Sequence, residues 1–221
     1  MNSLIDHTLL KADATEEQIR RLCDEAREFK FAAVCVNPFY VPLVHSLLQG
    51  SGVKTCSVIC FPLGAVSTPE KAAAARTAIS GGAQEVDMVM NIGALKDRRD
   101  GFVRADISAV AGICHAAGAL LKVILETGLL TDEEKERACK LCIEASVDFV
   151  KTSTGFGAGV AMVEDVMLMS NIVKSAGLGV KASGGIRTLA AVQEMTVAGA
   201  TRIGTSSGVA IMKEIQTANK H

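Results

Sequence analysis

The chain has 221 residues, of which 49% are hydrophobic and 21% are charged. That length and composition fit one globular domain with a sizeable core, so we expect a single domain over residues 1–221. A net charge of -1 and an aromatic content of 4%, without tryptophan, argue against a nucleic-acid or base-stacking protein.

The N-terminal segment MNSLIDHTLLKADAT lacks the apolar stretch of a signal peptide, and no apolar run reaches the length of a membrane span. The seven cysteines are odd in number and mostly scattered, which is typical of a reducing compartment. Cys139 and Cys142 form a C-x-x-C sequence inside a helical pattern, and we interpret them as packing residues. We therefore expect a cytoplasmic protein with no nucleic-acid and no membrane partner.

Short apolar runs rich in β-branched residues recur from one end of the chain to the other. They lie at residues 4–9, 32–36, 55–60, 85–90, 121–126, 147–151, 178–183 and 201–206. Continuous apolarity is typical of parallel strands that are covered on both faces.

Helical signals fill the gaps between these strands. Thr15 with Gln18 has the spacing of a capping box, and Thr68 before Pro69 is expected to cap another helix. Glycine recurs directly before a strand, where it can end a helix in the left-handed conformation, at Gly82, Gly118, Gly177 and Gly199.

The repeated unit of helix, glycine and strand predicts the α/β class. Eight units of about 28 residues each match a (β/α)8 TIM barrel, with a short N-terminal strand and a C-terminal helix. A doubly wound open sheet is the alternative. Such a sheet carries a glycine-rich binding loop after its first strand, and no G-x-G-x-x-G or Walker A sequence is found here.

Charged residues interrupt several of the predicted strands. Asp87 lies within EVDMVM, Lys122 and Glu126 flank VIL with the same parity, Lys151 ends VDFVK, and Lys181 lies within GVKAS. An inward charge near the C-terminal end of a barrel strand lies at the usual active-site mouth. The alternative for each lysine is an outward side chain that extends between the helices.

Lys151 and Lys181 at adjacent strand ends favour a Schiff-base chemistry. A lysine amine attacks a carbonyl only when it is unprotonated, and burial or a neighbouring cation lowers its proton affinity. The resulting iminium is an electron sink for cleaving a carbon–carbon bond, and Asp87 is the candidate proton relay.

Three glycine-rich segments follow the late strands: residues 152–157, 183–187 and 204–208. Barrels often bind phosphate with the loops after strands seven and eight, through backbone N–H groups and a helix N-terminus. These segments therefore predict a phosphate site, with simple tight turns as the alternative.

Six motifs resemble the deoxyribose-phosphate aldolase family and cover most of the chain: IDHTLL (5–10), EVDMVMNIG (85–93), LKVILETG (121–128), VKTSTGF (150–156), VKASGGIR (180–187) and RIGTSSG (202–208). The resemblance implies a class I aldolase that reversibly cleaves 2-deoxy-D-ribose 5-phosphate into acetaldehyde and D-glyceraldehyde 3-phosphate. It implies a phosphorylated sugar and aldehydes as partners, no cofactor and no metal, and a homodimer.

The resemblance also implies roles for individual residues. Lys151 is the Schiff-base lysine, Lys181 is the second lysine, and Asp87 relays protons. Substrate and phosphate contacts are implied for Asp6, Lys122, Thr152, Gly155, Gly184, Gly185, Gly204, Ser206 and Ser207. Cys35 matches a family cysteine near the substrate mouth and is a candidate reactive thiol, with a buried small hydrophobic side chain as the alternative.

The chain departs from the family pattern in three places. Ala12 replaces a common proline, residues 157–160 differ from common versions of that loop, and the C-terminal TANKH has no tyrosine.

Three other functions stay open at this point. A metal-dependent aldolase needs clustered ligands, whereas the histidines are scattered at His7, His45, His115 and His221. Another Schiff-base lyase or a transaldolase-like barrel shares the lysine chemistry. A non-catalytic phosphate-binding barrel would use the glycine-rich loops alone.

Overall fold

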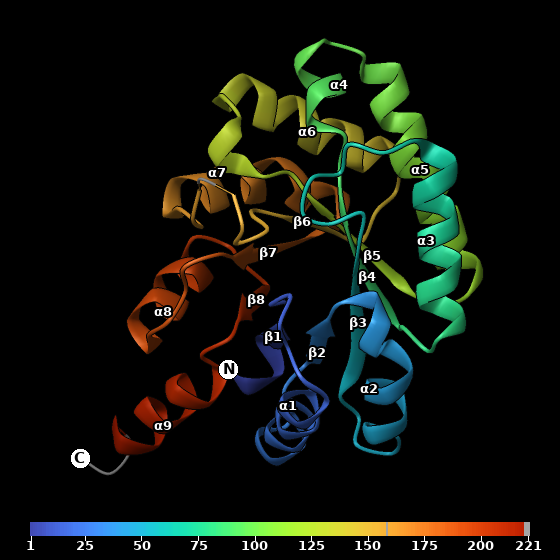
Figure 1. Ribbon diagram of the computed structural model, residues 1–221. Coiled ribbons are helices and arrows are strands. Elements are labelled where there is room, and N and C mark those ends of the chain that lie inside the picture. Colours follow the sequence, from blue (N-terminus) through green and yellow to red (C-terminus); the bar gives the residue numbers. More distant parts are fainter. Residues whose placement is uncertain (158, 219–221) are drawn as a thin grey trace.

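The computed structural model describes residues 1–157 and 159–218. Within these residues, parallel strands β1 to β8 close into a barrel, and the α-helices surround it (Figure 1). Each strand pairs with its neighbour in the chain, and β1 pairs with β8. The predicted (β/α)8 TIM barrel is therefore confirmed.

The strands are β1 (Ile5–Leu9), β2 (Ala33–Val36), β3 (Lys54–Ile59), β4 (Glu85–Val89), β5 (Leu120–Ile124), β6 (Phe149–Lys151), β7 (Gly179–Ser183) and β8 (Arg202–Thr205). The α-helices are α1 (Glu16–Phe29), α2 (Val41–Leu47), α3 (Thr68–Ser80), α4 (Ile92–Lys96), α5 (Asp100–Ala116), α6 (Asp132–Glu144), α7 (Val163–Val173), α8 (Leu189–Val197) and α9 (Gly208–Ala218). The observed strands lie within about two residues of the predicted ones, as such boundaries allow.

The helix termini follow the local sequence with one correction. The capping box of Thr15 and Gln18 opens α1, and the four glycines before strands all have positive φ. The prediction that Thr68 caps α3 is wrong by one residue, because Ser67 is the cap and forms a capping box with Glu70. The Thr68 hydroxyl instead donates to Asp106 Oδ1 of α5 at 2.7 Å.

Buried side chains alternate between two environments along each strand. Outward residues such as Val86, Val150 and Val180 pack with the helices in the main hydrophobic core. Inward residues form a small apolar cluster around Cys35 and Cys56, and next to it lies a group of buried charges. Because successive residues of a strand point to opposite faces, these charged side chains lie inside the barrel, apart from the main hydrophobic core. None of the described helices has the length and apolarity needed to cross a membrane.

Candidate active site

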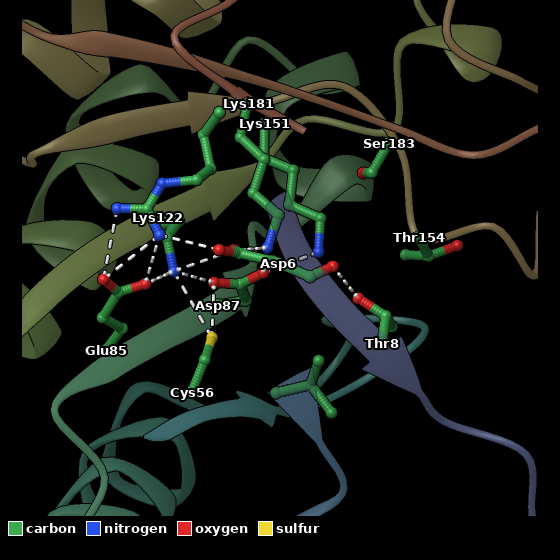
Figure 2. Close-up of polar contacts among 12 residues, drawn as sticks. Asp6, Thr8, Cys56, Glu85, Asp87, Lys122, Lys151, Thr154, Lys181 and Ser183 are labelled. Atoms are coloured by element: carbon green, nitrogen blue, oxygen red, sulfur yellow. Dashed lines mark hydrogen bonds and ion pairs between the residues drawn. The ribbon is translucent and has the colours of Figure 1, made fainter. Parts of the chain in front are cut away.

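Charged side chains from six strands, β1 and β4 to β8, meet inside the barrel (Figure 2). Asp87 on β4 lies at the centre of this group. Its Oδ2 atom is 2.7 Å from Lys151 Nζ and 2.7 Å from Lys181 Nζ, and its Oδ1 atom is 2.8 Å from Lys122 Nζ. Consecutive parallel strands in register place β4 to β7 side by side, so Lys181 reaches a carboxylate 94 positions away in the chain.

The electrostatics of the interior favour the ionised form of this carboxylate. Burial alone would raise the pKa of Asp87, but the charges of Lys122, Lys151 and Lys181 hold that pKa well below its usual range. Burial likewise opposes the charge on Lys181, yet the carboxylates of Asp6 and Asp87 raise the pKa of Lys181 above its ordinary value. Lys181 is therefore a cation beside Lys151 in the protein without substrate.

A cavity of about 340 Å³ opens above this group, at the C-terminal ends of β1, β6, β7 and β8. Lys151 lines the cavity, whereas Lys122, Lys181 and Asp87 lie beneath it among the fully buried residues. A larger hollow of about 600 Å³ lies at the opposite end of the barrel, and its described lining residues include no lysine. Because Lys151 lines the smaller cavity, that cavity is the candidate active site.

Glycine shapes the wall of this cavity. Gly184 and Gly185 follow β7 with φ of 96° and 78°, a conformation that side chains disfavour. Gly204 on β8 is needed for a different reason, since a Cβ there would lie 3.0 Å from Lys181 Cε. A glycine at that position lets the Lys181 side chain reach Asp87 and Asp6.

Sequence comparison identifies the family of this chain. Residues 1–215 match the family model for "DeoC/LacD family aldolase". The chain belongs to this aldolase family. It is 56% identical over 215 residues to a deoxyribose-phosphate aldolase of Clostridium tetani, covering 97% of this chain and 98% of that protein. It is 60% identical over 211 residues to the Shouchella clausii protein of the same name, covering 95% and 93%.

A solved structure of the family gives the same fold. The deoxyribose phosphate aldolase from Aeropyrum pernix, described as a tetramer, superposes with a TM-score of 0.92 and 35% sequence identity. The match covers 98% of this chain and 91% of that one.

The structure distributes the expected aldolase residues between the cavity wall and the layer below it. The wall contains Lys151, Gly155, Gly184, Gly185, Gly204 and Ser206. Asp6 and Lys122 are fully buried under the cavity, in contact with Lys181 and Asp87 respectively. Ser207 is absent from the described wall, and its backbone N–H donates to Thr205 Oγ1 at 2.9 Å.

Thr152 connects β6 to β7 and does not line the cavity in the described structure. Its Oγ1 atom donates to the Ser183 carbonyl and accepts from the Ser183 N–H, both at 3.0 Å. This residue holds the two lysine-bearing strands together.

Glu126 is not part of the lysine group, contrary to the parity argument from the sequence. Strand β5 ends at Ile124, and Glu126 has a left-handed backbone with φ of 57°. Its buried carboxylate accepts from the Thr154 N–H at 3.2 Å and from the Thr154 hydroxyl at 2.5 Å. The chain turns before Glu126, so this side chain holds the loop after β6 instead.

Cys35 is fully buried next to Cys56, and its reactivity stays a prediction. The hydrogen bond from Cys56 lowers the pKa of Cys35, whereas burial raises the pKa of Cys56 well above its usual value. Cys56 Sγ is 3.2 Å from Asp87 Oδ1, so it contributes a neutral thiol to the buried group. Cys35, Cys56 and Asp87 have the spacing of a metal site, but the Asp87 carboxylate is already paired with lysine ammonium groups.

Sequence reasoning gave no role to Thr8 and Lys11, which line the cavity, or to Glu85 and Arg202, which extend the buried charges below it. Thr154 and Arg187 also line the cavity; they lie in two of the predicted glycine-rich segments but were not singled out. Thr8 has the parity of Asp6, and Glu85 has the parity of Asp87, so the two-residue period of a strand was an available signal. Ala12 is exposed in the described loop after β1, while Ala158 and residues 219–221 lie outside the described residues.

Proposed function

We propose that this chain reversibly cleaves 2-deoxy-D-ribose 5-phosphate into acetaldehyde and D-glyceraldehyde 3-phosphate through a Schiff base on Lys151. Membership of the aldolase family and the names of its relatives support the reaction class. One observation carries the assignment of the lysine: of the three interior lysines, Lys151 alone is among the described residues that line the cavity. A nucleophile must reach its substrate, and Lys122 and Lys181 are covered.

The charge of the cavity wall supports a phosphorylated substrate. Lys11, Lys151 and Arg187 are in the wall, and no carboxylate is found among its described residues. Backbone turns at Gly184 and Gly185 leave N–H groups accessible, and Ser206 offers a hydroxyl just before α9. Cations, backbone N–H groups and a helix N-terminus are the usual components of a phosphate site.

The reaction begins at the Lys151 amine. The nitrogen adds to C1 of the open-chain sugar phosphate, and loss of water with uptake of one proton gives a cationic iminium. The C3 hydroxyl then loses its proton, the C2–C3 bond breaks, and its electron pair forms an enamine with C1 and the nitrogen. Glyceraldehyde phosphate leaves, C2 takes a proton, and water hydrolyses the iminium to release acetaldehyde.

Asp87 and Lys181 relay the proton from the C3 hydroxyl. As the iminium forms, Lys181 passes its proton through Asp87, 2.7 Å away, to the departing hydroxyl, which leaves as water. The positive charge of the iminium beside Lys181 favours this transfer. Neutral Lys181 then accepts the hydroxyl proton. Because neither side chain lines the cavity, this transfer passes through an intervening water.

Reductive trapping tests this function. The protein is reduced with sodium borohydride in the presence of acetaldehyde, and the adduct is located by intact-mass measurement and peptide mapping. We expect a two-carbon adduct on Lys151, which Lys151→Leu abolishes and Lys213→Met, at an exposed site on α9, preserves. Substrate-dependent trapping that survives in Lys151→Leu would refute the assignment. Sugar-phosphate binding without turnover would support a non-catalytic barrel, and a different donor aldehyde would support another Schiff-base enzyme.

We also propose a single aldolase domain over residues 1–221, a cytoplasmic location, a homodimer and no metal requirement. The seven cysteines, all within the described residues, are free thiols, which fits a reducing compartment. The Aeropyrum pernix relative is a tetramer, so light scattering on the purified protein is the direct test of the dimer. Full activity in excess chelator is expected, and its loss would contradict the last proposal.

A further inference from the structure

The buried charges under the cavity continue beyond the lysines toward the opposite end of the barrel. Lys122 Nζ, which contacts Asp87, also lies 2.6 Å from Glu85 Oε2. Glu85 in turn lies 3.0 Å from Arg202 Nη1. Glu85 begins β4 and Arg202 begins β8, so this pair is at the end of the barrel farthest from the cavity mouth.

A second path returns from Arg202 to Asp87. Arg202 Nη1 is 2.7 Å from Asp6 Oδ1, and the other oxygen of Asp6 accepts a hydrogen bond from Lys181. Lys181 Nζ is 2.7 Å from Asp87 Oδ2. Figure 2 shows Asp6, Lys181 and Asp87 pointing toward one another. The two paths together close a ring in which carboxylates and cations alternate.

We call this ring the ion ring; its members are Asp87, Lys122, Glu85, Arg202, Asp6 and Lys181. Among the described residues it contains three carboxylates and three cations, so its net charge is zero. Lys151 contacts the ring only through Asp87 Oδ2 and has no other carboxylate partner in the described structure. The ammonium form of Lys151 is therefore a surplus charge in a buried environment, which is unfavourable.

The members of the ring stabilise one another in their charged forms. Burial opposes ionisation of Asp6, but Lys181, Lys122 and Arg202 lower the pKa of Asp6 below its usual range. Burial also opposes the charge on Lys122, but Asp87 and other acidic neighbours raise the pKa of Lys122 well above its usual value. The ring therefore keeps its charges, and Lys151 is the interior lysine outside that balance.

We propose that Arg202 and Glu85 are positioning residues that set the charge state of the Lys151 amine by balancing the charges of the ion ring. Neither residue lines the cavity in the described structure, so neither touches substrate. Their influence reaches Lys151 through Lys122, Asp6 and the shared carboxylate of Asp87. The proposal rests on the function proposed above for Lys151.

Four other titratable or charged groups face this interior or its mouth. They are unchanged in the variants of Arg202 and Glu85 described below. They are the thiols of Cys35 on β2 and Cys56 on β3, and the cavity-wall cations Lys11 and Arg187. A thiolate at Cys35 would add a fourth negative charge to the interior and would balance the ammonium form of Lys151. Cys35→Ala therefore tests the charge count, and we expect it to leave the ionisation midpoint of Lys151 unchanged.

Substitutions at the two distant residues should act in opposite directions. Arg202→Gln leaves three carboxylates for Lys122, Lys181 and Lys151, so the Lys151 ammonium gains a partner and the amine form requires a higher pH. Glu85→Gln removes a carboxylate and gives the amine form at a lower pH. We expect each shift to be about one pH unit, or about tenfold in amine population near neutrality. The double substitution restores the original balance, so its midpoint should return toward that of the unchanged protein.

The experiment measures the rate of reductive trapping of acetaldehyde on Lys151 as a function of pH, with cyanoborohydride as reductant and peptide mapping of the adduct. The expected result is an upward shift for Arg202→Gln, a downward shift for Glu85→Gln, and near cancellation in the double variant. Arg104→Gln, which breaks an exposed ion pair with Glu144, is the matched control and should not shift the midpoint.

The outcomes separate this inference from the proposed function. Absence of a Lys151 adduct in the unchanged protein would refute the function. A Lys151 adduct whose midpoint stays fixed in Arg202→Gln and Glu85→Gln, or shifts in the same direction in both, would refute the inference. If Arg202→Gln does not fold, Arg202→Lys keeps the positive charge and should keep the midpoint. Glu85→Gln still shows whether the midpoint shifts to lower pH, as expected. A midpoint shift in Cys35→Ala would also overturn the charge count.

Discussion

Lys151 and Lys181 share a single oxygen atom, since each Nζ lies 2.7 Å from Asp87 Oδ2. The two amines nevertheless differ in their surroundings. Lys181 has a second carboxylate in Asp6 and is fully buried, whereas Lys151 is at the cavity wall. Two neighbouring ammonium groups repel each other, and Lys181 has more acidic contacts than Lys151. This asymmetry is consistent with the roles proposed above for the two lysines.

Asp87→Asn should separate Schiff-base formation from bond cleavage. The amide cannot relay a proton between Lys181 and the substrate, so we expect kcat to fall by about 10²–10⁴-fold. The substitution removes a negative charge beside Lys151 and leaves that lysine at the cavity wall, so acetaldehyde trapping on Lys151 should persist. Activity assays and trapping on the same sample measure both effects.

The control for Asp87→Asn is Asp165→Asn on α7, which weakens a buried pair with Lys135 outside the barrel interior. Asp165→Asn should reduce the free energy of unfolding but leave kcat largely intact. Equal losses of kcat in the two variants would mean that Asp87 acts only through stability.

Arg187→Met should reduce the affinity for the phosphorylated substrate. Arg187 is an exposed cation in the cavity wall, and the loss of one charge-assisted contact is worth about 1.5–3 kcal/mol. We therefore expect KM for deoxyribose 5-phosphate to rise by roughly 10–100-fold. KM for unphosphorylated deoxyribose should change little, and steady-state kinetics with both substrates measure the difference.

Arg187→Lys is the matched variant because it keeps the positive charge. It should recover part of the lost affinity, since lysine binds phosphate as a point charge without the paired N–H groups of arginine. An equal rise in KM for both sugars in Arg187→Met would instead indicate a change in the shape of the cavity.

Local pattern was enough to predict the strands, the barrel, Lys151, Lys181 and Asp87. The ion ring was not predictable in the same way, because Arg202 meets Asp6 only where β8 closes against β1, 196 positions apart in the chain. Glu85 could have been found from its parity with Asp87, but its partner depends on the register of all the strands between them. Arg187 lies in a segment predicted to form the phosphate site, whereas the loop residue Lys11 follows no period and carries no such signal, so only the folded structure places it in the cavity.

Glu126→Gln should loosen the loop after β6. Glu126 Oε2 accepts from both the N–H and the hydroxyl of Thr154, and Oε1 lies 3.4 Å from the same N–H. Glutamine replaces one of these oxygens with an NH2 group, which cannot accept and faces a donor. We expect a loss of about 1–3 kcal/mol in the free energy of unfolding, measured by urea titration. Because Thr154 lines the cavity, KM should rise more than kcat falls.

Thr154→Val provides the test of that pairing. If Glu126 acts through Thr154, the double variant should lose less stability than the sum of the two single variants. Strict additivity would show that the two side chains act independently.

The ion ring should also make the protein sensitive to acid. The pKa values of Asp6 and Asp87 are lowered in the folded state, whereas both groups titrate near 3.9 in an unfolded chain. Their contribution to stability is therefore present above about pH 5 and is lost as the pH falls below that value, by roughly 1.4 kcal/mol per pH unit for each carboxylate. Urea titrations at a series of acidic pH values measure this slope. Asp6→Asn lacks one of the two groups, so its slope should be shallower by about one proton even though the variant is less stable overall. An unchanged slope in Asp6→Asn would mean that carboxylates outside the ion ring control acid unfolding.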